Sequence, residues 1–280
     1  MEIPFVKMHG NGNDFVLIDE YEGDVIPGEM KPAFARLYCE RRFGIGADGV
    51  LFLSKSERND IKMRLFQPDE SEAEMCGNGI RCLVKYAFDA GYVQGRCIVE
   101  TLAGEITVTL GYREDIFHAT ITMPTPAFGR GQIPATGEGE YHEQIGGYDV
   151  YAVNTGVPHA VVFVEELAVV DIGKIAPIIR NHPTFPEGAN VNFVEVVNEN
   201  EIRIRTFERG IEGETYSCGT GATASAAVAH HLGYAGEPDK KYVGTKVLVA
   251  TQGGLLTIYL NEETLMEGAA TTVFEGSIFF

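Results

Sequence analysis

The sequence predicts an α+β fold that consists of two similar, duplicated domains. Two observations predict it: motifs of the first half recur in the same order in the second half, and each half alternates short strand-like segments with helix-forming ones. We expect an N-terminal domain over residues 1–122 and a C-terminal domain over residues 123–268. The apolar tail, residues 269–280, is expected to return to the N-terminal domain as a strand.

The internal repeat has a period of about half the chain. The segment CGNG (76–79) recurs as CGTG (218–221), 142 positions later. Four further pairs keep the same order along the two halves: FGIGAD with FPEGAN, IKMRLF with IRIRTF, TLAG with TQGG, and GNDFVLID with GVPHAVVFVE. Five landmarks in one order indicate a duplication of the whole domain.

Residue patterns predict the elements of each half. Strands are expected where β-branched residues alternate or cluster, at 15–19, 50–54, 61–66, 97–101 and 105–110. Helices are expected at 31–42, 80–91, 172–182 and 222–233, and the segments that follow the two CGxG motifs each end in a glycine. The stretch 125–140 contains several Pro and Gly residues and is expected to link the domains.

Composition narrows the class of protein. The 280 residues are 45% hydrophobic and carry a net charge of −18, which disfavours binding to nucleic acid or to an anionic membrane surface. The N-terminal segment lacks the features of a signal peptide, and no apolar run is long enough to span a bilayer. Five cysteines without a CxxC spacing favour free thiols in a reducing compartment. We therefore expect a cytoplasmic enzyme.

Two of the cysteines, Cys76 and Cys218, occupy matched positions of the repeat, each at the start of a predicted helix. A helix N-terminus presents free N–H groups and a positive dipole end, which can hold a substrate carboxylate and favour a thiolate. If the two halves face each other across a cleft, one thiolate can remove a proton from Cα and the other thiol can deliver one. The remaining cysteines, Cys39, Cys82 and Cys97, lack such partners and are expected in the core.

The sequence does not support a dinucleotide site, a zinc site or a phosphate-binding loop. Residues 44–49 match GxGxxG, but a helix precedes them and a strand follows, the reverse of a dinucleotide fingerprint. His230 and His231 lack the HExxH spacing of a zinc site. There is no phosphate-binding loop and no evident context for a Schiff-base lysine, so we expect neither a cofactor nor a metal.

Seven motifs together resemble the diaminopimelate epimerase family over nearly the full chain: KMHGNGNDF, FGIGADG, SEAEMCGNGIRC, PH (158–159), EGAN, FERG and GETYSCGTGA. The resemblance implies a pyridoxal-phosphate-independent epimerase that interconverts LL- and meso-2,6-diaminopimelate in lysine and peptidoglycan-precursor synthesis. It also implies a homodimer of chains with two domains, each a mixed β-sheet wrapped on a central helix, with the active site in the cleft between them.

Transferred by position, the resemblance makes Cys76 and Cys218 the acid/base pair. It implies that His159 and Glu208 tune the pKa values of these cysteines. The expected substrate contacts are Asn13, Gly77, Asn78, Asn190, Glu208, Arg209, Gly219 and Thr220, where Gly77, Gly219 and Thr220 offer backbone donors to a carboxylate.

The sequence departs from the family pattern at the positions expected to hold the distal end of the substrate. Segment 67–72 reads QPDESE where Asn-Ala-Asp-Gly-Ser-Glu is common, Val157 replaces an Asn, and Gly49 replaces a Gln. Glu70 also stands where glycine would adopt a positive φ more easily. Two alternatives therefore stay open: a two-cysteine racemase of another amino acid, such as proline or histidine, and an inactive amino-acid-binding module.

Overall fold

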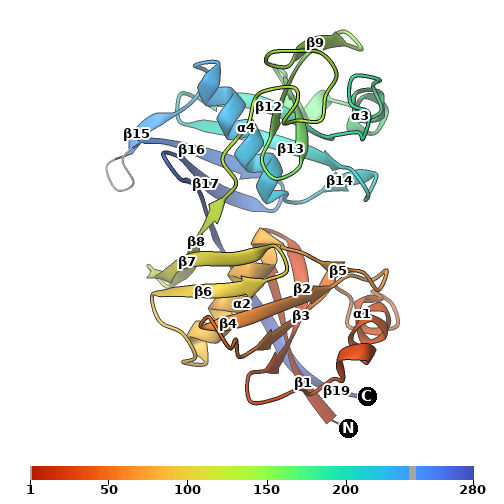
Figure 1. The fold of residues 1–280 in the computed structure, drawn as a ribbon, viewed down its shortest axis with the longest axis vertical. Helices are drawn as coiled ribbons and strands as arrows, with labels where there is room; N and C mark the ends of the chain where they lie inside the picture. Colours follow the sequence, from red (N-terminus) through yellow and green to blue (C-terminus); the bar gives the residue numbers. More distant parts are fainter. Residues whose placement is uncertain (1, 240–243) are drawn as a thin grey trace. The chain divides into compact units, whose positions relative to one another are not determined.

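The computed structural model describes residues 2–239 and 244–280. The chain divides into two compact units (Figure 1). Unit 1 comprises the chain up to Ile121 together with Gly268–Phe280, and unit 2 comprises Thr122–Glu267. The predicted α+β fold with two similar halves is confirmed.

Unit 1 contains two α-helices and nine strands among its described residues. Its helices are Lys31–Cys39 (α1) and Gly77–Asp89 (α2), with a short 3-10 turn at Gly28–Met30 (η1). Its strands are Glu2–Gly10 (β1), Asn13–Glu20 (β2), Gly49–Ser54 (β3), Ile61–Phe66 (β4), Glu72–Ala73 (β5), Arg96–Thr101 (β6), Gly104–Arg113 (β7), Ile116–Met123 (β8) and Thr271–Phe279 (β19), where β8 continues into unit 2.

Unit 2 likewise contains two α-helices and one 3-10 turn among its described residues. Its helices are Ile172–Arg180 (α3) and Gly219–His231 (α4), with a 3-10 turn at Leu167–Val169 (η2). Its strands are His142–Ile145 (β9), Tyr148–Asn154 (β10), Pro158–Phe163 (β11), Asn190–Asn198 (β12), Glu201–Glu208 (β13), Gly213–Thr215 (β14), Glu237–Asp239 (β15), Gly244–Thr251 (β16), Gly254–Leu260 (β17) and Thr264–Ala269 (β18), where β18 continues into unit 1.

The two units share one strand order. Unit 1 runs β19, β1, β2, β3, β4, β6, β7, and unit 2 runs β9, β10, β11, β12, β13, β16, β17. The parallel pairs fall at the same places, β2–β3 and β4–β6 in unit 1, and β11–β12 and β13–β16 in unit 2. All other pairs in this order are antiparallel, so each unit is a mixed sheet with the same topology.

In each unit the sheet wraps around one helix. Helix α2 contacts β1, β2, β3, β4, β7 and β19, and α4 contacts β10, β11, β12, β13, β16 and β17. Figure 1 shows these two helices running through their units, whereas α1 and α3 lie at the margins. Helix α4 is buried without interruption from Gly221 to Ala229, and its many alanines allow strands to approach it closely.

Both central helices end in the same way. Gly91 and Gly233 follow them with φ values of 80° and 72°, in the left-handed region that glycine adopts freely. The N–H groups of Tyr92 and Tyr234 donate to the carbonyls of Ala87 and Ala229, which is the bonding pattern of a Schellman motif. The predicted glycine ends of both helices are confirmed. Among the described residues, no helix combines the length and the apolar character that crossing a bilayer requires.

The stretch 125–140 does not serve as a linker, and this prediction is wrong. It belongs to unit 2, where the side chain of Ile133 is fully buried in the hydrophobic core and Ala127 bridges Asn154. The chain passes between the units earlier, within β8. The Pro and Gly residues shape turns inside unit 2, and one buried isoleucine is enough to fix the stretch there.

Helix α1 is shorter than predicted. It ends at Cys39, and the N–H groups of Ile45 and Gly46 donate to the carbonyl of Tyr38, so the following segment folds back on the end of the helix. The segment 44–49 thus connects a helix to the strand β3, as expected, and its order of elements is the opposite of a dinucleotide-binding turn.

Glu70 has a φ of 73° in the loop between β4 and β5, a conformation that strains any residue with a Cβ. We therefore expect Glu70→Gly to be more stable to urea unfolding than Glu70→Ala, by about 1 kcal/mol. Both variants lose the exposed ion pair with Arg36, so the comparison isolates the backbone. Equal stability, or the usual advantage of alanine over glycine, would contradict the assigned strain.

Candidate active site

Cys76 and Cys218 occupy equivalent positions at the N-caps of α2 and α4. Both have extended backbones, with φ and ψ of −146° and 115° at Cys76 and −121° and 110° at Cys218. Each Sγ atom accepts a hydrogen bond from the N–H group three residues later, of Gly79 at 3.5 Å and of Gly221 at 3.4 Å. The prediction that each cysteine opens a helix is confirmed. A sulfur at an N-cap receives a donor and lies at the positive end of the helix dipole, which favours the thiolate.

The other three cysteines are core residues, as predicted. Cys39, Cys82 and Cys97 are buried, and burial raises the pKa of each thiol to about 12. They therefore stay protonated at neutral pH and are poor proton acceptors.

Asn13 and Asn78 surround Cys76 in unit 1. The Cys76 thiol donates to Asn13 Oδ1 at 3.6 Å, and Asn78 Nδ2 donates to the same oxygen at 3.2 Å. Asn13 Nδ2 donates to Asp48 Oδ2 at 2.7 Å. This carboxylate can only accept, so it fixes the orientation of the Asn13 amide and turns its oxygen toward Cys76.

Behind Asn13 lies a network of ion pairs that sequence reasoning did not assign. Arg41 binds Asp48 at 2.7 Å and Asp14 at 2.8 Å, and Lys7 binds Asp14 at 2.6 Å. Burial alone would raise the pKa of Asp14, but the hydrogen bonds and charges of Arg41 and Lys7 outweigh it and lower the pKa to about 2. The Asp14 carboxylate is therefore charged at neutral pH and joins Arg41 and Lys7 in one network. Lys7 and Asp14 lie within KMHGNGNDF and Asp48 lies within FGIGADG, whereas Arg41 lies outside these motifs.

Arg81 on α2 is a second residue that sequence reasoning missed, and it is fully buried. Its guanidinium donates to the carbonyls of Gly77 and Ala269 and to the side-chain oxygens of Asn11 and Asn78. Burial lowers the pKa of Arg81, and charge interactions with Cys82 and Cys76 oppose that change. Arg81 thus holds the first turn of α2 and places a positive charge near Cys76.

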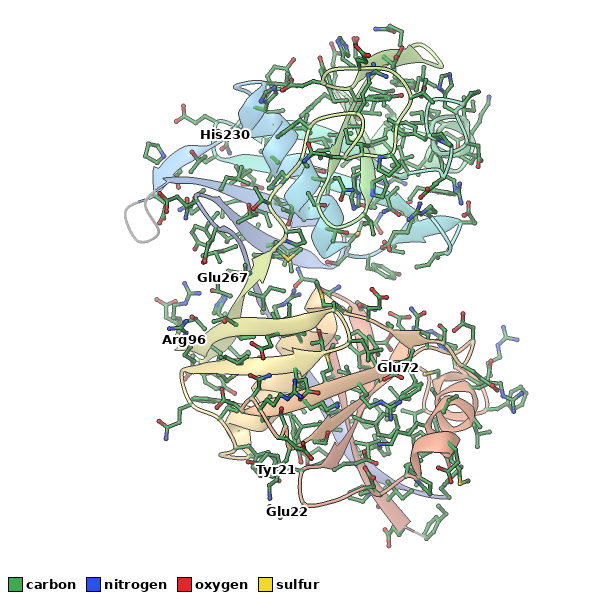
Figure 2. All side chains as sticks on the ribbon, in the orientation of Figure 1. Tyr21, Glu22, Glu72, Arg96, His230 and Glu267 are labelled. Atoms are coloured by element: carbon green, nitrogen blue, oxygen red, sulfur yellow. The ribbon has the colours of Figure 1, made fainter. Side chains whose placement is uncertain are left out.

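A paired hairpin leads the chain into Cys76. Glu72 on β5, labelled in Figure 2, forms a bidentate pair with Arg64 on β4 at 2.6 and 2.8 Å. The side-chain oxygen of Gln67, where the family often has Asn, accepts from the Ser71 hydroxyl at 2.9 Å within the same loop. At Gly49 a Cβ would lie 2.7 Å from Leu65 Cδ1 and 3.1 Å from the carbonyl oxygen of Phe66, so a larger residue there requires the Leu65 side chain to move.

In unit 2, a short chain of hydrogen bonds connects His159 to Cys218. The ring Nε2 of His159 lies 2.9 Å from Thr220 Oγ1, which in turn lies 3.3 Å from Cys218 Sγ. Burial, followed by the charge of Arg209, lowers the pKa of His159 to about 3. His159 is therefore neutral at physiological pH and contacts the cysteine through Thr220 rather than directly.

Asn190 and Arg209 form the neighbouring part of this site. Asn190 Oδ1 accepts from the backbone N–H of Arg209 at 2.8 Å, which ties the end of β13 to the start of β12. Arg209 Nη1 donates to the carbonyls of Glu187 and Gly188. The described residues offer no acceptor to its Nε and Nη2, and these atoms can bind a carboxylate. Glu208 accepts from the Thr215 hydroxyl.

The expected site residues thus gather in two groups. Asn13, Gly77 and Asn78 lie around Cys76 in unit 1. Thr220, Gly219 and His159 lie around Cys218 in unit 2, next to Asn190, Glu208 and Arg209. Val157, where the family often has Asn, is half-buried in the turn before β11, and its carbonyl accepts from the N–H of Thr155.

Comparisons with curated proteins and families give one consistent result. The family model described as diaminopimelate epimerase matches residues 5–123, almost all in unit 1, and residues 151–273, mostly in unit 2. The protein named diaminopimelate epimerase of Methanothrix thermoacetophila is 54% identical, over 99% of this chain and 96% of its own length. That of Methanocella arvoryzae is 51% identical, over 99% and 97%.

Solved structures with the same fold are more distant in sequence. A phenazine biosynthesis protein of the PhzF family from Bacillus anthracis has a TM-score of 0.71 at 18% identity, covering 100% of both chains. A hydroxyproline epimerase from Agrobacterium vitis has a TM-score of 0.65 at 18% identity, covering 99% of this chain and 92% of its own. These likenesses concern the fold. On the family match and the close relatives, this chain belongs to the diaminopimelate epimerase family.

Proposed function

We propose that the protein is a cofactor-independent epimerase that interconverts LL- and meso-2,6-diaminopimelate, with Cys76 and Cys218 as the acid/base pair. The observation that carries this proposal is the equivalence of the two cysteines. Each is the N-cap of the central helix of its unit, and its sulfur accepts a hydrogen bond from the N–H group three residues later. The names of the close relatives support the choice of substrate.

The reacting carboxylate of the substrate is bound by backbone N–H groups at the two helix starts and by Arg209. The first N–H groups of a helix have no acceptor within that helix, so Gly77, Gly219 and Thr220 offer backbone donors to an anion. Arg209 adds a charged, planar donor whose position is set by two backbone carbonyls. The amides of Asn13, Asn78 and Asn190 bind polar groups of the substrate, and Glu208 binds its ammonium group.

Proton transfer requires the two cysteines to be in different protonation states. One cysteine acts as a thiolate and removes the α-proton, and the other acts as a thiol and delivers a proton to the opposite face of the same carbon. The carbanion formed in between is stabilised by the donors that hold its carboxylate. His159 and Glu208 tune the acidity of the cysteines, and His159 does so through Thr220.

We further propose that the enzyme works in the cytoplasm as a homodimer, in lysine and peptidoglycan-precursor synthesis. Its five cysteines are odd in number and include no CxxC pair, which suits a reducing compartment. The net charge of −18 suits a partner that is a small zwitterion rather than a nucleic acid or an anionic membrane.

The test is to incubate the purified protein with LL-diaminopimelate without added cofactor and to separate the stereoisomers by chiral chromatography. The proposal predicts formation of the meso form until the two isomers reach equilibrium. Proline, hydroxyproline and histidine serve as a parallel panel. Racemisation of one of these with no action on diaminopimelate would replace the assigned substrate, and binding without any conversion would leave an inactive binding module.

Arg209→Lys is expected to lower kcat/KM for diaminopimelate by about 10- to 100-fold. A lysine cannot bind the carbonyls of Glu187 and Gly188 and still present two parallel donors to a carboxylate. Arg203→Lys is the matched control, because Arg203 lies on β13, the strand that Arg209 follows, is exposed and pairs with Glu195 at 3.5 Å. Steady-state kinetics of both variants decide the matter, and equal activities would remove Arg209 from the site.

A further inference from the structure

Asn192 is a fully buried amide on β12, one strand away from His159. Its Nδ2 donates to the carbonyl of Ala160 at 3.1 Å and lies 3.0 Å from His159 Nδ1. Its Oδ1 accepts from the Thr206 hydroxyl at 2.9 Å. A backbone carbonyl can only accept, so the amide atom that faces Ala160 must be the nitrogen. The orientation of the Asn192 side chain is therefore set by the backbone.

This orientation determines where the proton of the neutral His159 ring lies. A proton on Nδ1 would point at the Asn192 donor over 3.0 Å, whereas an unprotonated Nδ1 accepts from it. The proton therefore lies on Nε2. On that side, Asn190 Nδ2 lies 3.5 Å from Nε2 and already donates to the carbonyl of Pro158, and the shorter contact is the one to Thr220 Oγ1 at 2.9 Å. The 3.0 Å contact between Asn192 Nδ2 and Nδ1 therefore decides the tautomer, because the contact between Asn190 Nδ2 and Nε2 is longer, at 3.5 Å.

With the proton on Nε2, His159 donates to the oxygen of Thr220. The hydroxyl hydrogen of Thr220 cannot then bond to His159 and is free to point at Cys218 Sγ, 3.3 Å away. The donors to a thiolate at Cys218 then include the Thr220 hydroxyl as well as the Gly221 N–H. Donors to the charged form of a thiol stabilise the thiolate.

We propose that Asn192 is a positioning residue that fixes the Nε2–H tautomer of His159, so that Thr220 donates to Cys218 and stabilises its thiolate. This inference rests on the proposed acid/base role of Cys218. The charged group that acts on the His159 ring is Arg209, the residue after strand β13, and together with burial it disfavours the imidazolium. Asn192 thus acts on the reaction through two other side chains and does not itself touch the sulfur.

The tautomer is measured directly by nitrogen NMR of protein labelled at its histidines, without substrate. The His159→Gln variant identifies the signals of His159 among the seven histidines. We expect an unprotonated Nδ1 and a protonated Nε2, with shifts that do not change from about pH 5 to about pH 9. A proton on Nδ1, or a ring that titrates in this range, would overturn the proposal. Because no turnover is involved, this result stands apart from the proposed epimerase activity.

The effect on the sulfur is measured from the pH dependence of Cys218 alkylation by iodoacetamide, followed by mass spectrometry of its peptide. Asn192→Ala is expected to raise the apparent pKa of Cys218 by about one unit, the effect of one lost hydrogen bond to a charged group. Thr206→Val is the matched control, since it removes the other partner of the same amide and leaves the contact with His159. It is expected to leave the profile unchanged.

A double-mutant comparison tests whether Asn192 acts on Cys218 through His159 and Thr220 or through a general effect on packing. The Thr220→Val variant already lacks the hydroxyl that connects His159 to Cys218. In this background Asn192→Ala is expected to cause no further shift in the apparent pKa of Cys218. Equal shifts in Asn192→Ala and Thr206→Val, or an undiminished effect of Asn192→Ala in the Thr220→Val background, would show that Asn192 acts only on packing and would overturn the proposal.

Discussion

Cys76→Ser and Cys218→Ser are each expected to lower the turnover number for epimerisation by about 10²- to 10⁴-fold. A serine hydroxyl can occupy the same N-cap and accept from Gly79 or Gly221, so the helix starts are preserved. The hydroxyl is a far weaker acid than a thiol, however, and it is not ionised at neutral pH. The loss is therefore expected in kcat, while substrate affinity changes little.

The matched controls for these variants are Cys82→Ala and Cys97→Ala. Both remove a buried thiol whose pKa is raised to about 12 and which therefore stays protonated. The turnover number of each variant is expected to remain within about tenfold of the wild-type value, even if the melting temperature falls. Near-normal turnover in Cys76→Ser or Cys218→Ser would remove that residue from the acid/base pair.

Arg81→Met is expected to lower the free energy of unfolding by about 3–5 kcal/mol. Methionine fills the space of the apolar stem, but it leaves the oxygens of Gly77, Ala269, Asn11 and Asn78 without the donors that they now have in a buried site. Urea denaturation followed by circular dichroism measures the change.

Lys85→Met on the same helix is the control for Arg81→Met. Its ammonium group pairs with Asp89 four residues later, in a partly exposed position, so the loss is expected to stay below about 1 kcal/mol. If Arg81→Met unfolds at the same urea concentration as this control, the buried guanidinium does not hold the first turn of α2.

Much of the fold could be predicted from the sequence because the duplication is visible in it. The two CGxG motifs, 142 residues apart, mark equivalent helix starts, and the strand order of the two units is the same. The stretch 125–140 was not predicted correctly, because turn-forming residues do not reveal the burial of a single Ile133. The positive φ of Glu70 could be anticipated only from the family pattern of the resemblance, which often has glycine at this position.

The site was predictable only as far as its motifs extend. Cys76, Asn13 and Arg209 lie in recognisable segments, whereas Arg41 and Asn192 act through residues from other strands and loops. Pairings of this kind depend on the register of β11 against β12 and on the return of segment 43–49 along β2. Local sequence patterns do not encode them.

The central claim, acid/base catalysis by two cysteines, is tested most directly by epimerisation of LL-diaminopimelate in deuterium oxide. When one thiolate removes the α-proton and a different, solvent-exchanged thiol delivers the replacement, deuterium enters Cα of the product from the first turnover. The unreacted LL isomer stays unlabelled at early times. Mass spectrometry of both isomers at low conversion is expected to show a fully labelled meso form and an unlabelled substrate. A meso product that keeps the hydrogen of the substrate would contradict the claim, because it would mean that a single group removes and returns the same proton.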